Sequence, residues 1–269
     1  MSRLSTPVCP ANGGESTELS QLYRLMNGLE NCLGGGEGCV GLYGSISPSH
    51  TELLLRSLEK LTGMSGSESV LMDVGSGLCR PLIHALATGR VAACRGVEVD
   101  RVKCQKAEAF IELTKKRMRA KGMKLSSDFN VEVVNEPIEL VTSLDPVSHV
   151  YSFWEGVPVV ARAGLGKLFR ESTTARAICV VQRAMRCASP AEFMSGEYGF
   201  GPLRLLETRK VTMSGSGRSF QAYVFVKDAS RESGKRKQDT SIQQSFKAKR
   251  RRRVDGPPVR GASEHAVKL

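Results

Sequence analysis

The chain has 269 residues, 41% of them hydrophobic, which is enough for one sizeable core with terminal extensions. No apolar run approaches the roughly 18 residues that a membrane span needs, and the amino terminus lacks the apolar core of a secretory signal, so we expect neither a membrane-spanning nor a secreted protein. The net charge is +12, but residues 231–269 carry twelve Lys or Arg against four acids, so the basicity belongs mainly to a C-terminal tail suited to polyanions.

Residues 1–45 are expected to form a polar leader, one helix and a glycine-rich loop. Apolar residues at helical spacing within 17–30 predict a short amphipathic helix that packs on the core. The glycines of 32–41 predict a loop. Tyr43 follows this loop, and the sequence leaves open whether it contacts a ligand or only lies on the surface.

A second helix is expected to begin near Pro48 and to end at Gly63, because glycine readily adopts the left-handed backbone conformation that often follows the last residue of a helix. Ser49 and Glu52 have the spacing of a capping box, in which each residue's side chain bonds the backbone of the other. We place the beginning of the main domain, residues 46–228, just before this helix.

The segment 70–79 carries the pattern around which the rest of the chain is organised. A short apolar run predicts a strand ending near Asp73, Gly75 and Gly77 predict a tight turn, and a helix is expected from about Arg80. Glycines let the backbone approach a ligand closely, and the helix N-terminus offers free N–H groups. The pattern indicates a nucleoside pocket, with a glycine turn that binds nothing as the alternative.

A second expected strand, 95–99, carries Glu98, where a carboxylate can accept both ribose hydroxyls of a nucleoside cofactor. A dinucleotide usually needs G-x-G-x-x-G, which requires glycine where this chain has Arg80. S-adenosylmethionine has no phosphate, and Asp73 is placed to serve its amino-acid part. We therefore favour this methyl donor, although Cys79 occupies the position of the third glycine in G-x-G-x-G.

Beyond Glu98 the chain alternates strands and helices and closes with a hairpin. Asp100 is expected to cap a long helix ended by Gly122, whose basic run 115–121 is either solvated or in contact with phosphates. Strands are expected at 129–134, 147–153 and 177–182, a helix at 159–169, and the hairpin at 203–213 and 220–226. This order predicts an α/β fold with a mostly parallel sheet and an antiparallel edge, which binds ligands outside the carboxyl ends of its strands.

The segment 151–158 ends the fourth expected strand, where we expect the methyl acceptor to bind. Methyl transfer from a sulfonium is an in-line displacement, so the protein must mainly align the reacting atoms. Phe153 and Trp154 are expected to wall an apolar channel that lowers the pKa of an acceptor amine, with Ser152 holding cofactor or amine and Glu155 as proton acceptor. The alternative is that both aromatic residues belong to the core.

These motifs, in this order, resemble the disruptor-of-telomeric-silencing (Dot-one-like) histone lysine methyltransferases over about residues 40–185. The resemblance rests on Tyr43-Gly44 before a helix, Asp73-Val-Gly-Ser-Gly-Leu78 and Gly96-Val-Glu98. It implies the class I S-adenosylmethionine-dependent methyltransferase fold with a small N-terminal helical segment. It also implies methyl transfer to a lysine on the globular core of histone H3 in nucleosomes.

The resemblance assigns roles to individual positions. In that family a Tyr-Gly-Glu loop closes over the donor, and this chain has Ser45 in place of the Glu. The family's Asn-Asn-Phe segment falls around 151–154, where no Asn occurs. The positions expected to bind the donor are Tyr43, Gly44, Asp73, Gly75, Gly77, Arg80, Glu98, Asn135 and Glu136. The positions expected at the transferred methyl group are Tyr43, Ser152, Phe153 and Trp154.

Residues 229–269 are expected to form a disordered basic tail that directs the protein to the nucleus or contacts DNA, unless it merely increases solubility. Its two clusters are Lys235, Arg236 and Lys237, and then Lys247, Lys249, Arg250, Arg251, Arg252 and Arg253. Between them, Ile242 and Phe246 resemble a degenerate peptide ligand of the replication sliding clamp. Histone H3 in nucleosomes and DNA are thus the expected partners.

The eight cysteines include no C-x-x-C pair and the four histidines are scattered, so we expect reduced thiols and no metal site. Two rival functions stay open. One is a methyltransferase for RNA or a non-histone protein. The other is a chromatin-binding module whose donor pocket is degenerate.

Overall fold

A computed structural model of the chain describes residues 13–34, 44–228 and 230, with side chains from residue 17 onward. The chain divides into two units, Met1–Lys227 and Asp228–Leu269. Tyr43 and the tail residues predicted to bind DNA or the sliding clamp lie outside the described residues. The sheet and the helices named below belong to the first unit.

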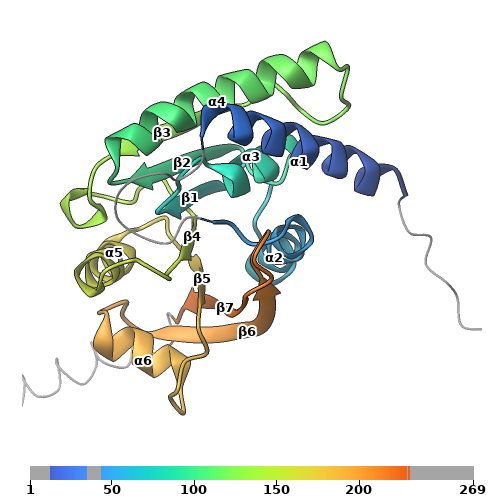
Figure 1. Cartoon of the computed structure of the whole chain (residues 1–269). Helices are drawn as coiled ribbons and strands as arrows, with labels where there is room; N and C mark the ends of the chain where they lie inside the picture. The colour runs from blue at the N-terminus through green and yellow to red at the C-terminus, as the bar shows by residue number, and fades with distance from the viewer. Residues whose placement is uncertain (1–12, 35–43, 229, 231–269) are drawn as a thin grey trace, which may run out of the picture. The chain divides into compact units, whose positions relative to one another are not determined.

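The sheet has seven strands in the order β3-β2-β1-β4-β5-β7-β6 (Figure 1). Strands β1 to β5 pair in parallel, whereas β7 pairs antiparallel with both β5 and β6. The prediction of a mostly parallel sheet with an antiparallel C-terminal hairpin is confirmed. The strands are β1 (Val70–Val74), β2 (Ala93–Glu98), β3 (Val131–Asn135), β4 (His149–Phe153), β5 (Ala177–Gln182), β6 (Leu203–Thr212) and β7 (Ser219–Lys227).

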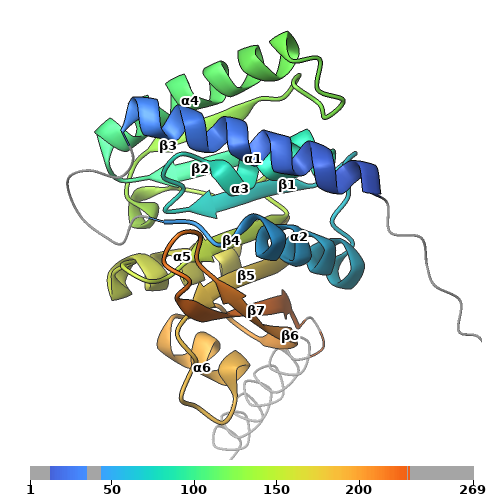
Figure 2. The same ribbon diagram turned by 45° about the vertical axis from the view of Figure 1, so that its right-hand side comes forward.

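Helices cover both faces of the sheet (Figures 1 and 2). Helices α1, α2, α3 and α4 pack against one face through one hydrophobic cluster. The short 3-10 helix η1 and helices α5 and α6 pack against the other face through a second cluster. Among the described residues the helices are α1 (Gly13–Leu33), α2 (Pro48–Thr62), α3 (Arg80–Ala87), α4 (Arg101–Ala120), η1 (Ile138–Leu140), α5 (Val159–Glu171) and α6 (Pro190–Glu197).

The central strands are mostly apolar on both sides because both of their faces are buried, with Asp73, His149 and Ser152 as buried polar exceptions. Successive side chains of a strand point to opposite faces, so Leu71 joins the cluster under α1 to α4 and Met72 the cluster under α5. Both side chains are almost fully buried. This sandwich holds the carboxyl ends of β1, β2 and β4 in a fixed relation.

The predicted capping box of α2 is wrong. The helix begins at Pro48 with Ser47 as its N-cap residue, so Ser49 lies inside it. Glu52 instead accepts hydrogen bonds from His84 Nε2 at 2.9 Å and from Arg90 at 2.6 Å. Since the His84 side chain is fully buried, Glu52 satisfies a buried polar group there instead of bonding the backbone at the start of α2. The expected cap of α4 is present, because Asp100 accepts from the backbone N–H groups of the helix's first turn at 2.9 and 3.3 Å.

Helix α6 was missed, since its segment reads as a proline- and glycine-rich connection. Ser189 caps it by accepting from Glu192 N at 3.4 Å, and Pro190 is its first residue. Both signals were present in the sequence. Within the described ranges, none of the helices combines the length and apolarity that crossing a bilayer requires.

Two helical glycines give opposite predictions for stability. An alanine Cβ at Gly166 in α5 would lie 1.9 Å from Tyr198 O, whereas one at Gly28 in α1 meets nothing within 4 Å. We expect Gly166→Ala to lower the free energy of unfolding by about 1–3 kcal/mol through overpacking. We expect Gly28→Ala to raise it by about 0.5–1 kcal/mol, because glycine loses more backbone entropy. Urea unfolding measures both, and an unchanged Gly166→Ala protein would contradict this packing.

Candidate functional site

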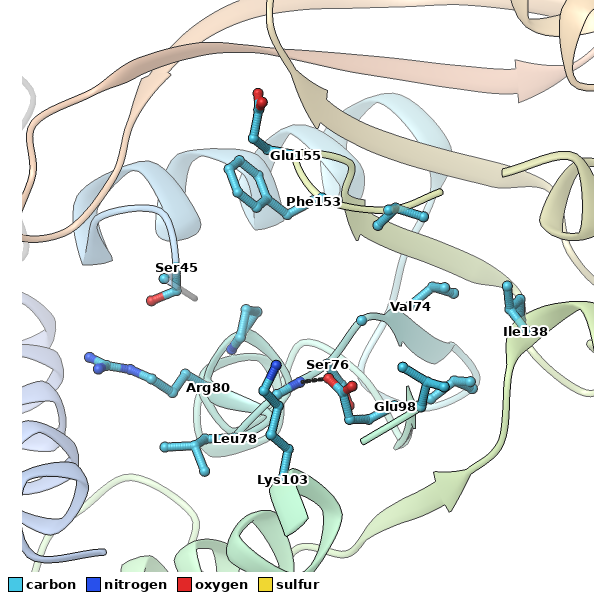
Figure 3. A pocket seen from close by; sticks show the side chains of 18 of the residues that line it. Ser45, Val74, Ser76, Leu78, Arg80, Glu98, Lys103, Ile138, Phe153 and Glu155 are labelled. Carbon is cyan, nitrogen blue, oxygen red and sulfur yellow. Dashed lines mark hydrogen bonds between the residues drawn. The ribbon is translucent and has the colours of Figure 1, made fainter. Parts of the chain in front are cut away.

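A cavity of about 630 Å³ opens at the carboxyl ends of β1, β2 and β4 (Figure 3). Its walls come from segments far apart in the sequence, including α1 and the hairpin turn after β6. The residues that line it include Asn27, Glu30, Asn31, Gly44, Ser45, Gly75, Ser76, Gly77, Arg80, Glu98, Lys103, Glu136, Ile138, Glu139, Phe153, Glu155, Gly156, Val157, Pro158, Ser214 and Gly215.

The glycine turn after β1 forms the floor of this cavity. Gly75 N and Ser76 N donate to Val97 O at 2.8 and 3.1 Å, which fastens the turn to β2. Gly75 and Gly77 have φ values of 82° and 50°, in the left-handed region that favours glycine. A Cβ at either position would meet no atom within 4 Å. The turn therefore needs glycine for its backbone conformation, and the space above it is open.

Cys79 occupies the third position of the glycine pattern and keeps the conformation that a glycine would adopt there. Its φ is 60°, and it is the only described non-glycine residue with a positive φ. The side chain is fully buried, and Cys79 N donates to Ser76 O at 2.8 Å. The substitution therefore preserves the backbone of the turn.

Glu98 ties this turn to the beginning of α4. Its Oε2 accepts from Gly77 N at 3.1 Å and its Oε1 accepts from Asp100 N at 3.0 Å. The residue is only 7% exposed, yet it lines the cavity next to the turn (Figure 3). A carboxylate oxygen accepts more than one hydrogen bond, so both oxygens can also accept from a ligand's hydroxyl groups.

Asp73 lies below the turn rather than in the cavity wall. It is 3% exposed, and burial, followed by the negative charge of Glu98, raises its pKa to about 8. A positive group bound above the turn would favour the ionised form of Asp73. Without such a group, Asp73 is thus a mostly protonated carboxyl beneath the site at neutral pH.

Arg80 brings helix α1 to the cavity. Its guanidinium forms an ion pair with Glu30, donates to Asn27 Oδ1 at 2.6 Å and lies over the ring of Tyr23 at 5.5 Å. The contribution of α1 to the cavity was missed. The polar residues Asn27, Glu30 and Asn31 are spaced three and four apart, but the same spacing marks an ordinary solvated helix face.

Of the two candidates after β3, only Glu136 lines the cavity. The Asn135 side chain instead donates to Glu98 O at 3.0 Å and Val99 O at 3.1 Å, which supports the end of β2. Lys103, in the first turn of α4, also lines the cavity and was missed. Lys103 belongs to no recognisable sequence motif, because its place in the cavity wall depends only on where α4 begins.

The predicted roles of Ser152 and Trp154 are wrong. Both side chains are fully buried. Ser152 Oγ donates to Val74 O at 2.8 Å, and Trp154 packs edge-on against Tyr198 with ring centroids 5.0 Å apart. Successive strand residues face opposite sides of a sheet, so Ser152, Phe153 and Trp154 cannot share one wall. Phe153 alone of the three lines the cavity.

Trp154 has a different use, as the anchor of the turn that follows β4. Val157 N donates to Trp154 O at 3.1 Å, and Gly156 has a φ of 91°, which is the geometry of a type II turn. Arg162 donates to Val157 O and Trp154 O, both at 2.9 Å, and its guanidinium lies 5.1 Å from the Trp154 ring. Arg162 thereby fixes the cavity wall formed by Glu155 to Pro158.

Glu155 sits on the rim of the cavity beyond Phe153. It pairs with Arg183 at 3.2 Å, and Figure 3 shows its carboxylate pointing away from Glu98. Gly44 and Ser45 also line the cavity. Ser45 O accepts from Ser214 N at 2.9 Å, so this segment is fixed to the hairpin turn.

The lining is predominantly acidic, with Glu30, Glu98, Glu136, Glu139 and Glu155 against Arg80 and Lys103. Such a wall favours a positively charged ligand. Dinucleotide-binding sheets of this type continue with a parallel sixth strand, whereas β7 here is antiparallel. The described residues contain no group of His, Cys, Asp and Glu that could hold a metal ion.

Similar solved structures have this architecture. A proposed RNA methyltransferase from Pyrococcus horikoshii superimposes with a TM-score of 0.50 and 18% identity, over 78% of this chain and 97% of that chain. Magnesium protoporphyrin IX methyltransferase from Synechocystis, crystallised with S-adenosylmethionine, gives a TM-score of 0.48 and 12% identity, over 82% and 100% of the two chains. No protein-family model matches the sequence, and no curated protein matches it significantly.

The similarity to the Pyrococcus protein shows the fold. The chain has the seven-stranded α/β fold of the class I methyltransferases, with the antiparallel strand inserted next to the edge of the sheet. The predicted fold class is confirmed.

The buried Asp73 predicts a specific pH dependence of stability. Its pKa of about 8 in the folded chain exceeds the ordinary 3.8, so between these values the folded state holds a proton that the unfolded state has lost. The free energy of unfolding should therefore fall as the pH rises through this window and level off above it. In Asp73→Asn this fall should be smaller, as measured by urea unfolding at several pH values. Identical pH dependence in the two proteins would contradict a raised pKa.

Proposed function

We propose that the protein is an S-adenosylmethionine-dependent methyltransferase. The observation that carries the proposal is Glu98, a nearly buried carboxylate held by Gly77 N and Asp100 N beside an open glycine turn. In this fold, that strand end is where a nucleoside's ribose is bound. The acidic lining suits the positively charged sulfonium, which supplies an electrophilic methyl group when the donor is bound.

The chain's own residues divide the work of holding the donor. Glu98 accepts from the ribose hydroxyls, and Glu136 and Ile138 flank the base. Arg80 and α1 serve the amino-acid end, and a positive group of the donor bound above the turn would favour ionisation of Asp73 below it. Phe153 covers the reacting side and excludes water, and Arg162 keeps the adjoining turn rigid, since catalysis of a displacement depends mainly on alignment.

For the acceptor we propose RNA, because the Pyrococcus protein of similar fold is described as an RNA methyltransferase. Two residues expected to surround a lysine amine, Ser152 and Trp154, are buried away from the cavity, which weakens the case for that acceptor. A lysine of histone H3 in nucleosomes is the second candidate. The acidic lining favours it, since a cationic side chain is attracted to such a wall.

The tail supports a nuclear location for either acceptor. Its basic clusters between Lys235 and Arg253 suit an import receptor or the phosphates of nucleosomal DNA. Ile242 and Phe246 offer a weaker match to a ligand of the replication sliding clamp. These roles are proposals from the sequence.

Donor binding should depend on the charge of Glu98. Glu98→Gln keeps the size of the side chain but removes a charged acceptor, and such hydrogen bonds contribute about 1.5–3 kcal/mol. We expect affinity for S-adenosylmethionine to fall about 10- to 100-fold by isothermal calorimetry. The matched control is Glu132→Gln, a carboxylate exposed on β3 that pairs with Arg95. A wild-type protein that does not bind the donor would overturn the proposed function.

The acceptor is identified by incubating labelled donor separately with RNA, nucleosomes and free histones. We expect label in RNA with the wild-type protein and none with Gly75→Arg, because a long side chain on the turn would fill the donor's space. Mass spectrometry of the products locates the methylated atom. Label confined to histone H3 would favour the second candidate, and donor binding without transfer to any of these would favour a degenerate binding module.

A further inference from the structure

The C-terminal end of α4 and the segment after it carry a concentrated positive charge. Residues 113–127 contain six cations and no acid, whereas residues 1–230 have a net charge of only +4, so the rest of that range is net negative. We call these six the α4 basic patch. They are Lys115, Lys116, Arg117, Arg119, Lys121 and Lys124.

Few of these charges form ion pairs with other described residues. Lys115 pairs with Glu112 at 2.6 Å, and Arg119 approaches Asp128 at 3.9 Å. The four remaining members of the patch are exposed, and none has an ion pair among the described residues. Lys124 contributes only its backbone N–H to Glu18, at 3.1 Å. Four cations are thus available to a partner.

Stabilisation of helix α4 does not account for the whole α4 basic patch. Cations in the last turn stabilise a helix by interacting with its dipole, which accounts for Arg117 and Arg119. The effect fades beyond the last turn, so Lys124 gains nothing from it. The apolar side of the helix is satisfied separately, since Phe110 and Met118 are fully buried in the core. The helix dipole therefore accounts for only part of the patch.

The patch lies far from the cavity. Helix α4 begins beside Glu98, and Lys103 in its first turn lines the cavity, whereas the patch lies at its other end (Figures 1 and 2). Twenty helical residues span about 30 Å at 1.5 Å each. No small molecule reaches both places. A nucleic-acid strand, with about 3.4 Å between charges, covers this distance in roughly nine nucleotides.

We propose that the α4 basic patch binds the phosphate backbone of the RNA acceptor at a distance from the methylated nucleotide. The inference rests on the proposed function for its choice of partner. Charge complementarity supports it: an acidic cavity repels the backbone, whereas four unpaired cations attract it. Phosphate contacts carry no base information, so the patch contributes affinity and orientation while the cavity selects the target.

The test replaces the four exposed cations Lys116, Arg117, Lys121 and Lys124 with Gln in the full-length chain. Binding of single-stranded RNA is measured by fluorescence anisotropy over a range of salt concentrations. Each lost phosphate contact lowers the slope of log K against log salt by about 0.7, so the slope should fall by about 3. Affinity for S-adenosylmethionine should not change, because the patch does not touch the cavity.

A control with the same loss of charge is available elsewhere on the surface. Lys60, Lys167, Arg204 and Lys210 are exposed, and replacing them with Gln should leave the slope unchanged. An equal fall in both variants would mean that only net charge matters, which overturns the patch. Unchanged RNA binding, or a loss seen only with duplex DNA or with an acidic protein, overturns it as well. Failure of the wild-type protein to bind the donor would instead count against the proposed function.

Discussion

The carboxylate of Glu98 is the contact on which the site depends. It joins three elements, because one oxygen holds the glycine turn after β1 and the other holds the first residue before α4. A nearly buried carboxylate is stable there only because backbone N–H groups satisfy it. The same arrangement that fixes the turn leaves lone pairs directed at the cavity. The Glu98 side chain therefore both stabilises the fold and is available to bind a ligand.

Charge is separated over the molecule in a way that suits a macromolecular acceptor. The cavity is acidic, whereas the far end of α4 is strongly basic. The buried guanidinium of Arg80 is compensated by Glu30 and Asn27. Four exposed cations at the far end of α4, Lys116, Arg117, Lys121 and Lys124, have no ion pair among the described residues. Because buried charges must be paired and exposed ones need not be, the unpaired cations are free to act on a partner.

Much of the fold was predictable, because its signals are local. The strand that carries Asp73, the glycine turn after it and the Asp100 cap each depend on residues close in sequence. Other features failed for identifiable reasons. The predicted Ser49 capping box is absent because Glu52 instead bonds the buried side chain of His84. Ser152 and Trp154 were predicted to line the cavity, but the alternation of side chains along a strand points them away from the wall that Phe153 forms. A prediction from local sequence therefore fails where a side chain bonds groups that are distant in the sequence.

The sequence by itself determined the order of the strands and of every described helix except η1 and α6, the glycine turn and the position of Glu98 at a strand end, since hydrophobic period and turn chemistry act over a few residues. Only the tertiary structure decided that α1 joins the cavity through Arg80, that Arg162 fixes the turn after β4, and that Phe153 faces inward alone. These contacts join residues separated by whole elements or depend on how the chain packs. No local pattern encodes them, because their free energy arises only when the layers meet.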